Sequence, residues 1–536
     1  MTENSESLTH ANPGDHQAKG LRSGAVGMIS VLFMAIANAA PITAMSFNVP
    51  VGAGWGNGIG VPAGFLFATI VLTIFTIGFS AMSKYITTTG AFYGFISHGL
   101  GQVWGMAAGL LATIAYIIFE GTLIGGFAYF AANTLNEMFG VSVNWLILAL
   151  GGMLLIWLLT YYDITLAAAV LGVTLVSEVL LLLSFGISVL VKGGPDGFMV
   201  GETVSLGAAF SNLEAGAYGS NVAAGTAALG IFFAFWSWIG YETTAVYGEE
   251  SKDPKRIVPR ATLIAVIGLG TFYTFTSWMA MVANGRKTAV EVSSGSTGNP
   301  VDLWLVPVQE NLGTFAYDLY RILLVVGSFA CAMAFHNAAA RYIYALGREL
   351  PFSGLRAKVG STHPKHKSPA VASTIATGIN IVMVLLFANF STAWTSDPAE
   401  AGATSDPNLL PYSVIYTVPS LVGTAFILAV QVICSFAIIG FFWGKNKKHK
   451  GNVVTTLIAP LIGASGMIYA LTLLNSAVSS GFAAGYQSNS LMVKYLFVEV
   501  GLTLGLGLLY ALWVKAKHPA IYAEIGRTVL EEAHER

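Results

Sequence analysis

Hydrophobic residues gather in long runs along this chain, and short polar stretches separate the runs. A helix that crosses a bilayer needs about 20 mostly apolar residues. We interpret twelve runs as spanning helices, at residues 24–50, 62–82, 103–132, 143–162, 165–192, 225–248, 260–283, 318–346, 369–389, 413–442, 452–474 and 493–514. The pattern predicts an all-α polytopic membrane protein of about 12 transmembrane helices.

The positive residues predict which side of the membrane each connecting segment faces. With the N-terminus inside, 21 of the 26 Lys and Arg fall in inside segments and 5 in outside segments. Cytosolic loops of membrane proteins carry an excess of Lys and Arg, and a missed helix early in the chain would scramble this ratio. We therefore expect a multi-pass protein of the cytoplasmic (inner) membrane with both termini cytosolic. The polar start of the chain has no signal-peptide pattern, which predicts a cytosolic tail at 1–22.

Composition supports a lipid environment and excludes other classes of protein. The chain is 55% hydrophobic and 10% charged, whereas soluble domains are about 25% charged, so the lipid bilayer is its expected partner. The net charge of −1 gives no basic footprint for nucleic acid. Cys331 and Cys434 each lie in an apolar run and predict free buried thiols.

Two of the apolar runs are interrupted at corresponding places. The first breaks at AAPITA (39–44) and the sixth at WIGYET (238–243), and the charge pattern makes these runs cross in opposite directions. Interrupted helices in two inverted halves mark the binding site of many transporters. We expect a 5+5 inverted repeat with discontinuous helices 1 and 6. Its parts are a first repeat at 23–192, a second repeat at 193–442, two further helices at 443–516 and a cytosolic tail at 517–536.

The residues at the breaks suit a binding site. Pro41 removes a backbone donor, its neighbours Ala40 and Thr43 are small, and Gly240 permits an unusual backbone conformation. Unpaired backbone groups in a membrane are tolerated where they line a cavity, and the N-terminus of a half-helix can hold a carboxylate. Each break alone is common in membrane helices, but the matched pair favours a functional site. Beside the second break, Trp236 and its aromatic neighbours suit an occluding lid or a cation–π platform, although some of them must simply pack.

Three carboxyl groups lie inside the apolar runs: Glu120, Glu178 and Glu242. Ionisable residues in a membrane are costly to keep and predict function, such as carrying a coupling proton or pairing with a substrate amine. The alternative for each is a protonated acid that hydrogen-bonds to a helix carbonyl. For His336 in the eighth run, we expect a packed or interface histidine rather than a proton relay.

Enzyme signatures are not found. The run GAGWGNGIG (52–60) fails the spacing of a phosphate-binding loop, and no H-E-x-x-H motif or Cys/His cluster suggests a metal. We therefore expect neither an enzyme nor a bound cofactor or metal.

Three segments carry a family resemblance. FWSWIGYETTAVYGEESKDPKRIVPRA (235–261) resembles the sixth-helix signature of amino acid permeases in the amino acid–polyamine–organocation (APC) superfamily. TTTGAFYGFISHGLGQVWG (87–105) is similar to the second-to-third helix region of that family, and FHNAAARYIYALGRELP (335–351) to its eighth-helix end. The resemblance runs from about residue 24 to 445.

The resemblance implies substrate contacts at both breaks. It places the substrate carboxylate on the first break, the amine and the gate on the second, and proton-linked gating at Glu242. Glu178 stands where some members carry a lysine in place of a sodium ion, and TAM (43–45) stands where many carry a Gly-Ser/Thr-Gly triplet. The implied substrate contacts are Ala40, Pro41, Ile42, Thr43, Ala44, Met45, Phe235, Trp236, Ser237, Trp238, Ile239 and Gly240.

The sequence thus predicts a secondary active transporter, a proton symporter or an exchanger, that moves an amino acid by alternating access. If Glu120 faces the site, a basic amino acid or a polyamine becomes the alternative substrate. A non-transporting membrane sensor is the rival from a different class. The high Gly and Ala content predicts close helix packing, which suits a homodimer as well as intramolecular contacts.

Overall fold

The computed structural model describes residues 24, 26–162, 164–211, 227–390, 410–444, 449–479 and 494–526, and the side chains of 164–171, 390, 413, 476–479 and 524 are not part of this description. Every regular element in this part of the chain is helical, apart from an isolated bridge between Val26 and Ser251. The predicted tail at 1–22 and the polar stretch at 391–409 lie outside the described residues.

The α-helices are α1 (Met28–Ala39), α2 (Pro41–Trp55), α3 (Val61–Ser83), α4 (Phe92–Leu100), α5 (Gln102–Phe139), α6 (Trp145–Tyr162), α7 (Ile164–Lys192), α8 (Val200–Thr203), α9 (Ala227–Trp236), α10 (Pro254–Asn284), α11 (Arg286–Ser293), α12 (Asp302–Leu312), α13 (Thr314–Gly347), α14 (Ser353–Val359), α15 (Ala370–Phe390), α16 (Thr417–Trp443), α17 (Ala459–Ser479), α19 (Leu496–Lys517) and α20 (Pro519–Glu524). Short 3-10 or π turns are η1 (Gly58–Gly60), η2 (Leu206–Phe210), η4 (Tyr241–Ala245), η5 (Gly248–Glu250), η8 (Pro411–Tyr416) and η9 (Val454–Ile458).

Eleven helical segments in the described part of the chain are long and apolar enough to cross a membrane, and each matches one predicted run. The remaining predicted run, 225–248, is interrupted: α9 ends at Trp236, a turn follows, and η4 begins at Tyr241. The first predicted run is also divided, since α1 ends at Ala39 and α2 starts at Pro41. The all-α polytopic fold predicted from the hydrophobic pattern is therefore confirmed.

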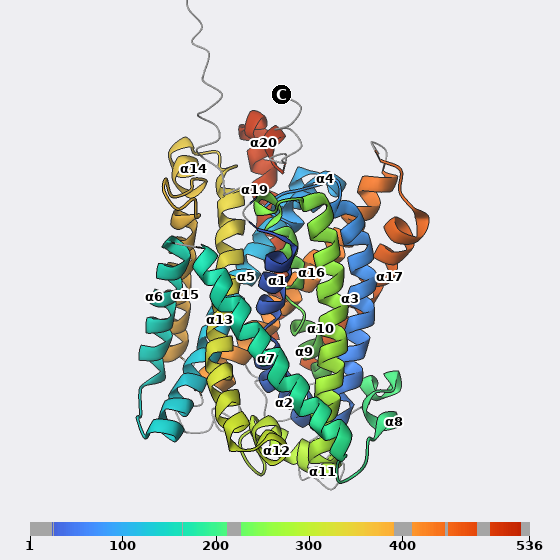
Figure 1. The fold of residues 1–536 in the computed structure, drawn as a ribbon. Helices are drawn as coiled ribbons and strands as arrows, with labels where there is room; N and C mark the ends of the chain where they lie inside the picture. The colour runs from blue at the N-terminus through green and yellow to red at the C-terminus, as the bar shows by residue number, and fades with distance from the viewer. Residues whose placement is uncertain are drawn as a thin grey trace, which may run out of the picture.

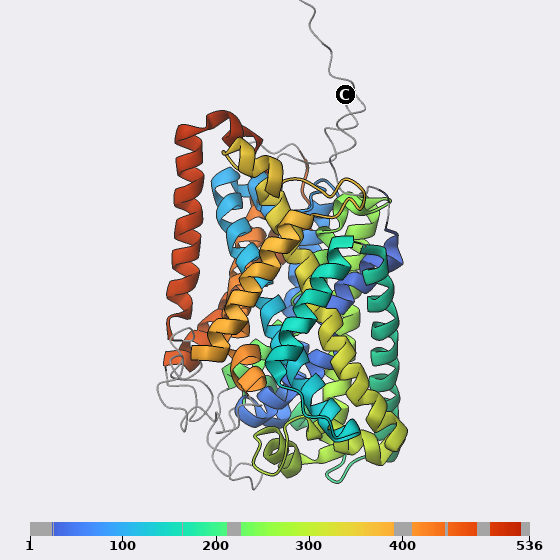
Figure 2. The same cartoon turned by 90° about the vertical axis from the view of Figure 1, so that its left-hand side faces the viewer.

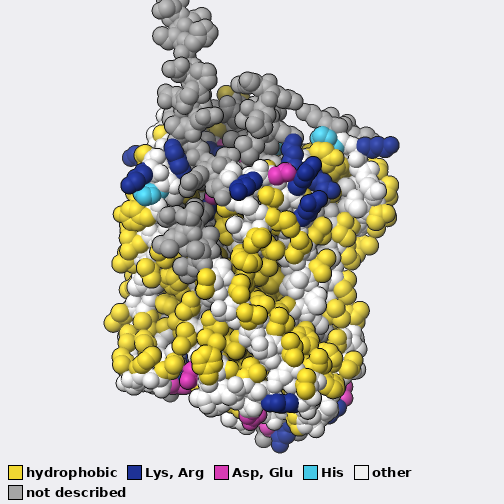
Figure 3. Space-filling view, viewed as in Figure 1, with side chains coloured by type: hydrophobic (Ala, Val, Ile, Leu, Met, Phe, Trp, Pro, Cys, Tyr) yellow, Lys and Arg dark blue, Asp and Glu magenta, His cyan; other side chains and the backbone are white. Residues whose placement is uncertain are grey.

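The long helices run roughly side by side between two ends of the molecule (Figure 1). α4, α14 and α20 lie at one end, and α8, α11 and α12 lie at the other. Lys and Arg side chains gather at the first of these ends, and hydrophobic side chains cover the band between the two (Figure 3). We call the end with α4, α14 and α20 the basic end. This band is the surface that lipid tails require.

The spans differ in how far they are enclosed by protein. In α5 and α13, 83% of the most apolar stretch is buried, against 17% in α19. Figure 2 shows α19 as an outer helix standing along one side of the bundle. The interior of the bundle is thus formed around α5 and α13, which pack against each other. The divided helices α1–α2 and α9–η4 meet in this interior, and nearly all side chains of α2, α9 and η4 are buried, as is the last turn of α1.

Candidate substrate site between two broken helices

The first helix is interrupted at a single residue. Ala40 adopts a left-handed backbone conformation (φ 40°, ψ 78°), and Pro41 directly after it starts a new helix with its fixed φ. The interruption leaves helical carbonyls without their usual partners. Two of these are satisfied from other helices: Tyr273 donates its hydroxyl to Ala39 O at 2.7 Å, and Cys331 donates its thiol to Asn38 O at 3.2 Å.

The second break lies directly against the first. Gly240 has φ 114°, a conformation that side-chain-bearing residues rarely adopt, and an added Cβ there would lie 2.5 Å from Asn38 Cβ. The side chain of Asn38 donates a hydrogen bond to Thr243 Oγ1 at 2.7 Å. A glycine is thus required both for the turn and for the close approach of the two helices.

A small cavity lies between the two breaks. Only about 20 Å³ of it admits a water-sized sphere, room for roughly one water molecule, so this form of the protein is closed around the site. Its walls come from α1, α2, α5, the turn after α9, α13 and η8. The lining residues are Asn38, Ala39, Ala40, Thr43, Ala44, Asn48, Leu123, Trp236, Ser237, Ile239, Cys331, Phe335 and Tyr416.

Hydrogen-bond acceptors dominate one side of this cavity. The Oδ1 atom of Asn38 is buried without a partner in the described part of the chain. The carbonyls of Ser237 and Ile239, in the turn after α9, accept no hydrogen bond from described residues either. Buried polar groups without partners are costly, which makes these acceptors candidates for a ligand's donor. An ammonium group supplies three such donors.

Fewer hydrogen-bond donors face the cavity from its other side, where α2 begins. Pro41 has no N–H, and the N–H of Ile42 donates to Glu178 Oε2 at 3.2 Å. The N–H of Thr43 has no hydrogen-bond partner among the described residues. None of the described residues that line the cavity is charged. The N-terminus of α2 is therefore the part of the cavity wall that suits a carboxylate.

Polar and aromatic side chains close the cavity toward the end opposite the basic end. Asn48 donates to Ser237 Oγ at 2.7 Å, and Tyr416 donates to Asn48 Oδ1 at 3.4 Å. The rings of Trp236 and Tyr416 lie 4.7 Å apart. Since these contacts join α2, the turn after α9 and η8, opening the site at this end must break them.

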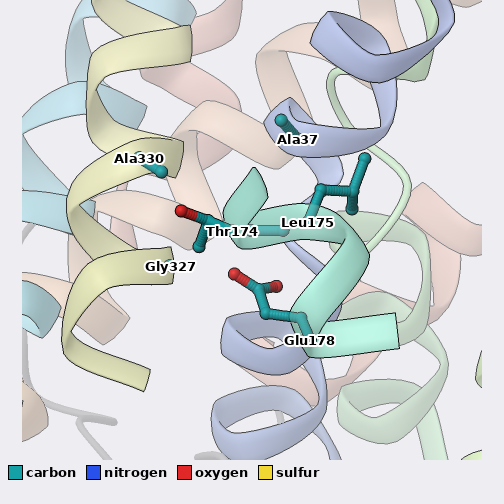
Figure 4. Close-up of a pocket in the computed structure, with 7 residues that line it drawn as sticks. Ala37, Thr174, Leu175, Glu178, Gly327 and Ala330 are labelled. Carbon is teal, nitrogen blue, oxygen red and sulfur yellow. The ribbon is translucent and has the colours of Figure 1, made fainter. Parts of the chain in front are cut away.

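Glu178 lines a second, smaller cavity, together with residues of α1, α7 and α13 (Figure 4). Its carboxylate points from α7 into the space between α7 and α13, close to Thr174 and Gly327. A Cβ on Gly327 would overlap Glu178 Oε1, so glycine provides the room for this carboxyl group. Ala40 lines both cavities. The two spaces therefore share the first helix break as a common wall.

Glu242 is fully buried beside the second break. Tyr116 of α5 donates to Glu242 Oε1 at 2.7 Å, and the N–H of Gly240 donates to Glu242 Oε2 at 3.0 Å. Both contacts favour the charged carboxylate, whereas its burial favours the protonated acid. Glu242 does not line the cavity, but it binds the backbone of the residue that forms the break. Glu242 therefore contributes to holding the backbone of the second break in place.

Glu120 lies away from the cavity, in a polar chain between four helices. Its Oε1 lies 2.8 Å from His336 Nδ1, and His336 Nε2 lies 2.7 Å from Ser373 Oγ. Ser373 lies 3.3 Å from the hydroxyl of Thr160. The chain thus connects α5, α13, α15 and α6. The structure gives Glu120 a histidine partner at the position where the sequence suggested a substrate contact.

The remaining residues of the predicted site lie at different distances from the cavity. Trp238 packs against Phe65 and Tyr273 and donates its indole N–H to Val266 O at 3.3 Å. Met45 O accepts from the indole of Trp304 at 2.9 Å. Phe235 packs edge-on against Phe67. None of Trp238, Met45 and Phe235 lines the cavity in the described structure, whereas Trp236, Ser237 and Ile239 do.

Six lining residues were not identified from the sequence: Asn38, Asn48, Leu123, Cys331, Phe335 and Tyr416. Asn38 and Asn48 could have been predicted from the sequence, because each is a polar residue in an apolar run close to the break. The other four come from α5, α13 and η8, whose rotation about their axes the hydrophobic pattern does not fix.

The basic end is closed by paired charges. Arg341 binds Glu250 at 2.8 Å, and Arg348 lies 3.2 Å from Glu249, which also accepts from the N–H of Thr89 at 2.8 Å. The backbone of Val26, just before α1, pairs with the strand-like segment after η5. These contacts tie the ends of α1, α13 and the segment that follows the second break.

Comparisons with known proteins agree with this geometry. The amino acid permease family model matches residues 26–499. The serine/threonine exchanger SteT of Bacillus subtilis is 20% identical over 404 residues, which are 74% of this chain and 79% of the exchanger. An uncharacterised transporter of Mycobacterium tuberculosis is 24% identical over 344 residues, 60% of this chain and 66% of that protein. The low-affinity putrescine importer PlaP of Escherichia coli is 23% identical over 162 residues, 29% of this chain and 34% of the importer.

The matched family and these relatives are transporters and not enzymes. The family model covers well over half of the chain, and the described part contains eleven helices fit to cross a membrane. The protein is therefore a multi-pass membrane transporter that belongs to the amino acid permease family.

Proposed function

We propose that this protein is a secondary active transporter that moves a neutral amino acid across the cytoplasmic membrane by alternating access. The observation that carries the proposal is the meeting of two helix breaks, at Ala40 and Gly240, at one buried cavity. Broken helices expose backbone dipoles to a ligand at the middle of the membrane.

The ends of the cavity fit the two charges of an amino acid. Asn38 Oδ1 and the carbonyls of Ser237 and Ile239 receive the ammonium group, and the N-terminus of α2 faces the carboxylate. Leu123 and Phe335 form an apolar wall, and Asn48 adds a polar group beside them. The uncharged lining of the described cavity favours a neutral side chain.

The proposed transport cycle uses two inverted repeats, at 23–192 and 193–442, with the basic end facing the cytosol. This orientation places the Lys and Arg of Figure 3 on the side that the positive-inside rule assigns to the cytosol. The Arg341–Glu250 and Arg348–Glu249 pairs then form the cytosolic closure, and Trp236 with Tyr416 closes the outer side.

Glu242 and Glu178 are the proposed sites of proton coupling or gating. Glu242 binds the N–H of Gly240 at the second break, and Glu178 binds the N–H of Ile42 at the first. Protonation of Glu242 weakens its hydrogen bond to the N–H of Gly240 at the second break. Protonation of Glu178 weakens its hydrogen bond to the N–H of Ile42 at the first break. Proton symport and proton-independent exchange both remain consistent with this arrangement.

The alternative substrate is a basic amino acid or a polyamine, and the short match to a putrescine importer is its support. Against it, no carboxylate among the described residues lines the cavity, and Glu120 pairs with His336. A second ammonium group would therefore lack a partner in this closed form.

Uptake into proteoliposomes tests the proposal. We would supply labelled amino acids and polyamines with and without an inward proton gradient, and with and without unlabelled substrate inside. Stimulation of neutral amino acid uptake by the gradient indicates symport, and uptake that requires internal substrate indicates exchange. Uptake of polyamines alone would support the alternative, and no uptake by folded protein would contradict a transport function.

A further inference from the structure

The N-terminus of α2 already holds a carboxylate that belongs to the protein. Glu178 Oε2 accepts the N–H of Ile42 at 3.2 Å, and Pro41 has no N–H to offer. Of the first three residues of α2, only Thr43 has an N–H without a partner in the described structure. The site that suits a substrate carboxylate is therefore largely occupied by Glu178.

Two carboxylates cannot share this helix end without cost. A helix N-terminus carries about half of a positive charge, enough to favour one anion. A second carboxylate nearby repels the first, and one of the pair then binds a proton, as in paired carboxyl groups of enzymes. The shared wall at Ala40 brings a substrate in the first cavity close to Glu178 in the second.

The surroundings of Glu178 supply no other compensating charge. The titratable groups that interact with it are Tyr273 of α10 and Tyr320 and Cys331 of α13. All three are neutral when protonated, and no Lys or Arg lines its cavity among the described residues.

The ammonium side of the substrate site is independent of this competition. Asn38 Oδ1 is buried, has no partner in the described chain and lines the substrate cavity. An amine can therefore bind there whether or not it carries a carboxylate. The contributions of the ammonium group and of the carboxylate to the binding affinity can therefore be measured separately.

We infer that Glu178 and the substrate carboxylate compete for the N-terminus of α2, so that an amino acid binds together with one proton on Glu178, whereas the corresponding amine binds without it. The inference rests on the proposed function and assigns its coupling proton to Glu178. A charged Glu178 also selects for amines, because it takes the place of their missing carboxylate.

Binding to the purified full-length chain tests the inference. The probes are the twenty protein amino acids and the amines that differ from them only by loss of the carboxylate. Thermal stabilisation identifies the binders, and titration calorimetry then gives their Kd from pH 5.5 to 8.5. Over the part of this range in which Glu178 of the free protein is charged, the Kd of the amino acid rises by up to tenfold per pH unit, since one proton is bound with it, while the Kd of its amine does not rise.

Variants locate the proton. In Glu178→Gln the Kd of the amino acid is expected to lose its pH dependence. Glu499→Gln is the matched control, because Glu499 is a carboxyl group on the outer helix α19 that lines neither cavity, and it should keep the wild-type profile. The wild-type comparison of amino acid with amine stands even if a variant does not fold.

The outcomes separate this inference from the proposed function. Equal pH dependence for amino acid and amine, or a pH dependence that persists in Glu178→Gln, overturns the competition and leaves amino acid transport intact. Binding of amines alone, or of no probe, overturns the amino acid assignment and the competition with it.

Discussion

The side-chain amide of Asn38 donates a 2.7 Å hydrogen bond to the hydroxyl of Thr243, 205 residues further along the chain. Thr243 in turn donates to the carbonyl of Gly240 at 2.5 Å. The last turn of α1 is thus tied to the break in the sixth span by side chains as well as by close packing. Because buried hydrogen bonds of this kind fix geometry, the two breaks hold their places relative to each other in the closed form.

Gly240→Ala should abolish uptake and lower thermal stability. The new Cβ meets Asn38 at 2.5 Å, and a positive φ costs a non-glycine residue roughly 1–2 kcal/mol before this clash is counted. Uptake and Tm of the purified variant are the measurements. Gly268→Ala in α10 is the control, since nothing lies within 4 Å of an added Cβ there. Wild-type uptake by Gly240→Ala would show that the second break needs no glycine.

Glu242→Gln should remove the part of the pH dependence of transport that comes from gating, while the protein stays folded and the pH dependence of amino acid binding, assigned to Glu178, is unchanged. Gln keeps the size of the side chain but cannot bind or release a proton at the position that holds Gly240 N–H. Tyr116→Phe, which removes the other hydrogen bond to Glu242, should shift the pH profile without flattening it. Uptake measured from pH 5 to 8 distinguishes these results. An unchanged profile in Glu242→Gln removes its proposed role in coupling.

Glu120→Gln should reduce uptake of a dicationic substrate and of a zwitterion by the same factor, because Glu120 contacts His336 and not the cavity. Competition of putrescine and of neutral amino acids for uptake measures this ratio. A selective loss of the dication would place Glu120 in the substrate site and favour the polyamine alternative.

His336→Ala should destabilise the protein strongly. It leaves Glu120 Oε1 without its hydrogen-bond partner in a buried position, which typically costs about 1–3 kcal/mol, and it adds the cost of the space left by the ring. Thermal unfolding of the wild type, His336→Ala and the double variant His336→Ala/Glu120→Leu gives the comparison. We expect the double variant to recover part of the lost stability. If it does not, the loss comes only from the space that the removed imidazole ring leaves, and not from the unpaired Glu120.

Much of this fold could be predicted from the hydrophobic pattern, but the side-chain directions could not. The breaks at Pro41 and Gly240 were visible because proline and glycine act on the backbone through their own geometry. Trp236 and Trp238 are two residues apart in one aromatic run, yet one lines the cavity and the other packs on Tyr273. The direction of the turn that follows α9 determines which of the two rings faces the cavity. That direction depends on tertiary contacts such as the hydrogen bond of Asn38 with Thr243.

The partners of the buried carboxyl groups were equally hidden. Glu120 and His336 are 216 residues apart, and nothing in their local sequence signals that they meet. Glu178 and Ile42 come together only because α7 crosses the first break. The sequence could therefore identify buried acids that need a hydrogen-bond partner. It could not identify that partner, because the partner depends on which helices are neighbours in the fold.

Acidification should weaken a surface pair at the end opposite the basic end. Arg286 donates two hydrogen bonds to Glu202 and thereby lowers the pKa of this carboxyl group. A lowered folded-state pKa stabilises the fold above the ordinary Glu value, near 4.3, and this contribution is lost as the pH falls through the lowered value. Since the pair is exposed, the loss should stay within about 1 kcal/mol. Tm measured from pH 6 to 3 should fall less in Arg286→Gln than in the wild type.

Protection of Cys331 by substrate tests the central claim, that substrate lies between the two helix breaks. Cys331 lines the cavity and binds Asn38 O, whereas Cys434, the other cysteine of the chain, lines neither cavity. In Cys434→Ser, a small methanethiosulfonate reagent should modify Cys331 more slowly when the transported amino acid is present. In Cys331→Ser, modification of Cys434 should not respond to substrate. Equal protection of both thiols, or none at Cys331 at a saturating substrate concentration, would contradict the placement of the site.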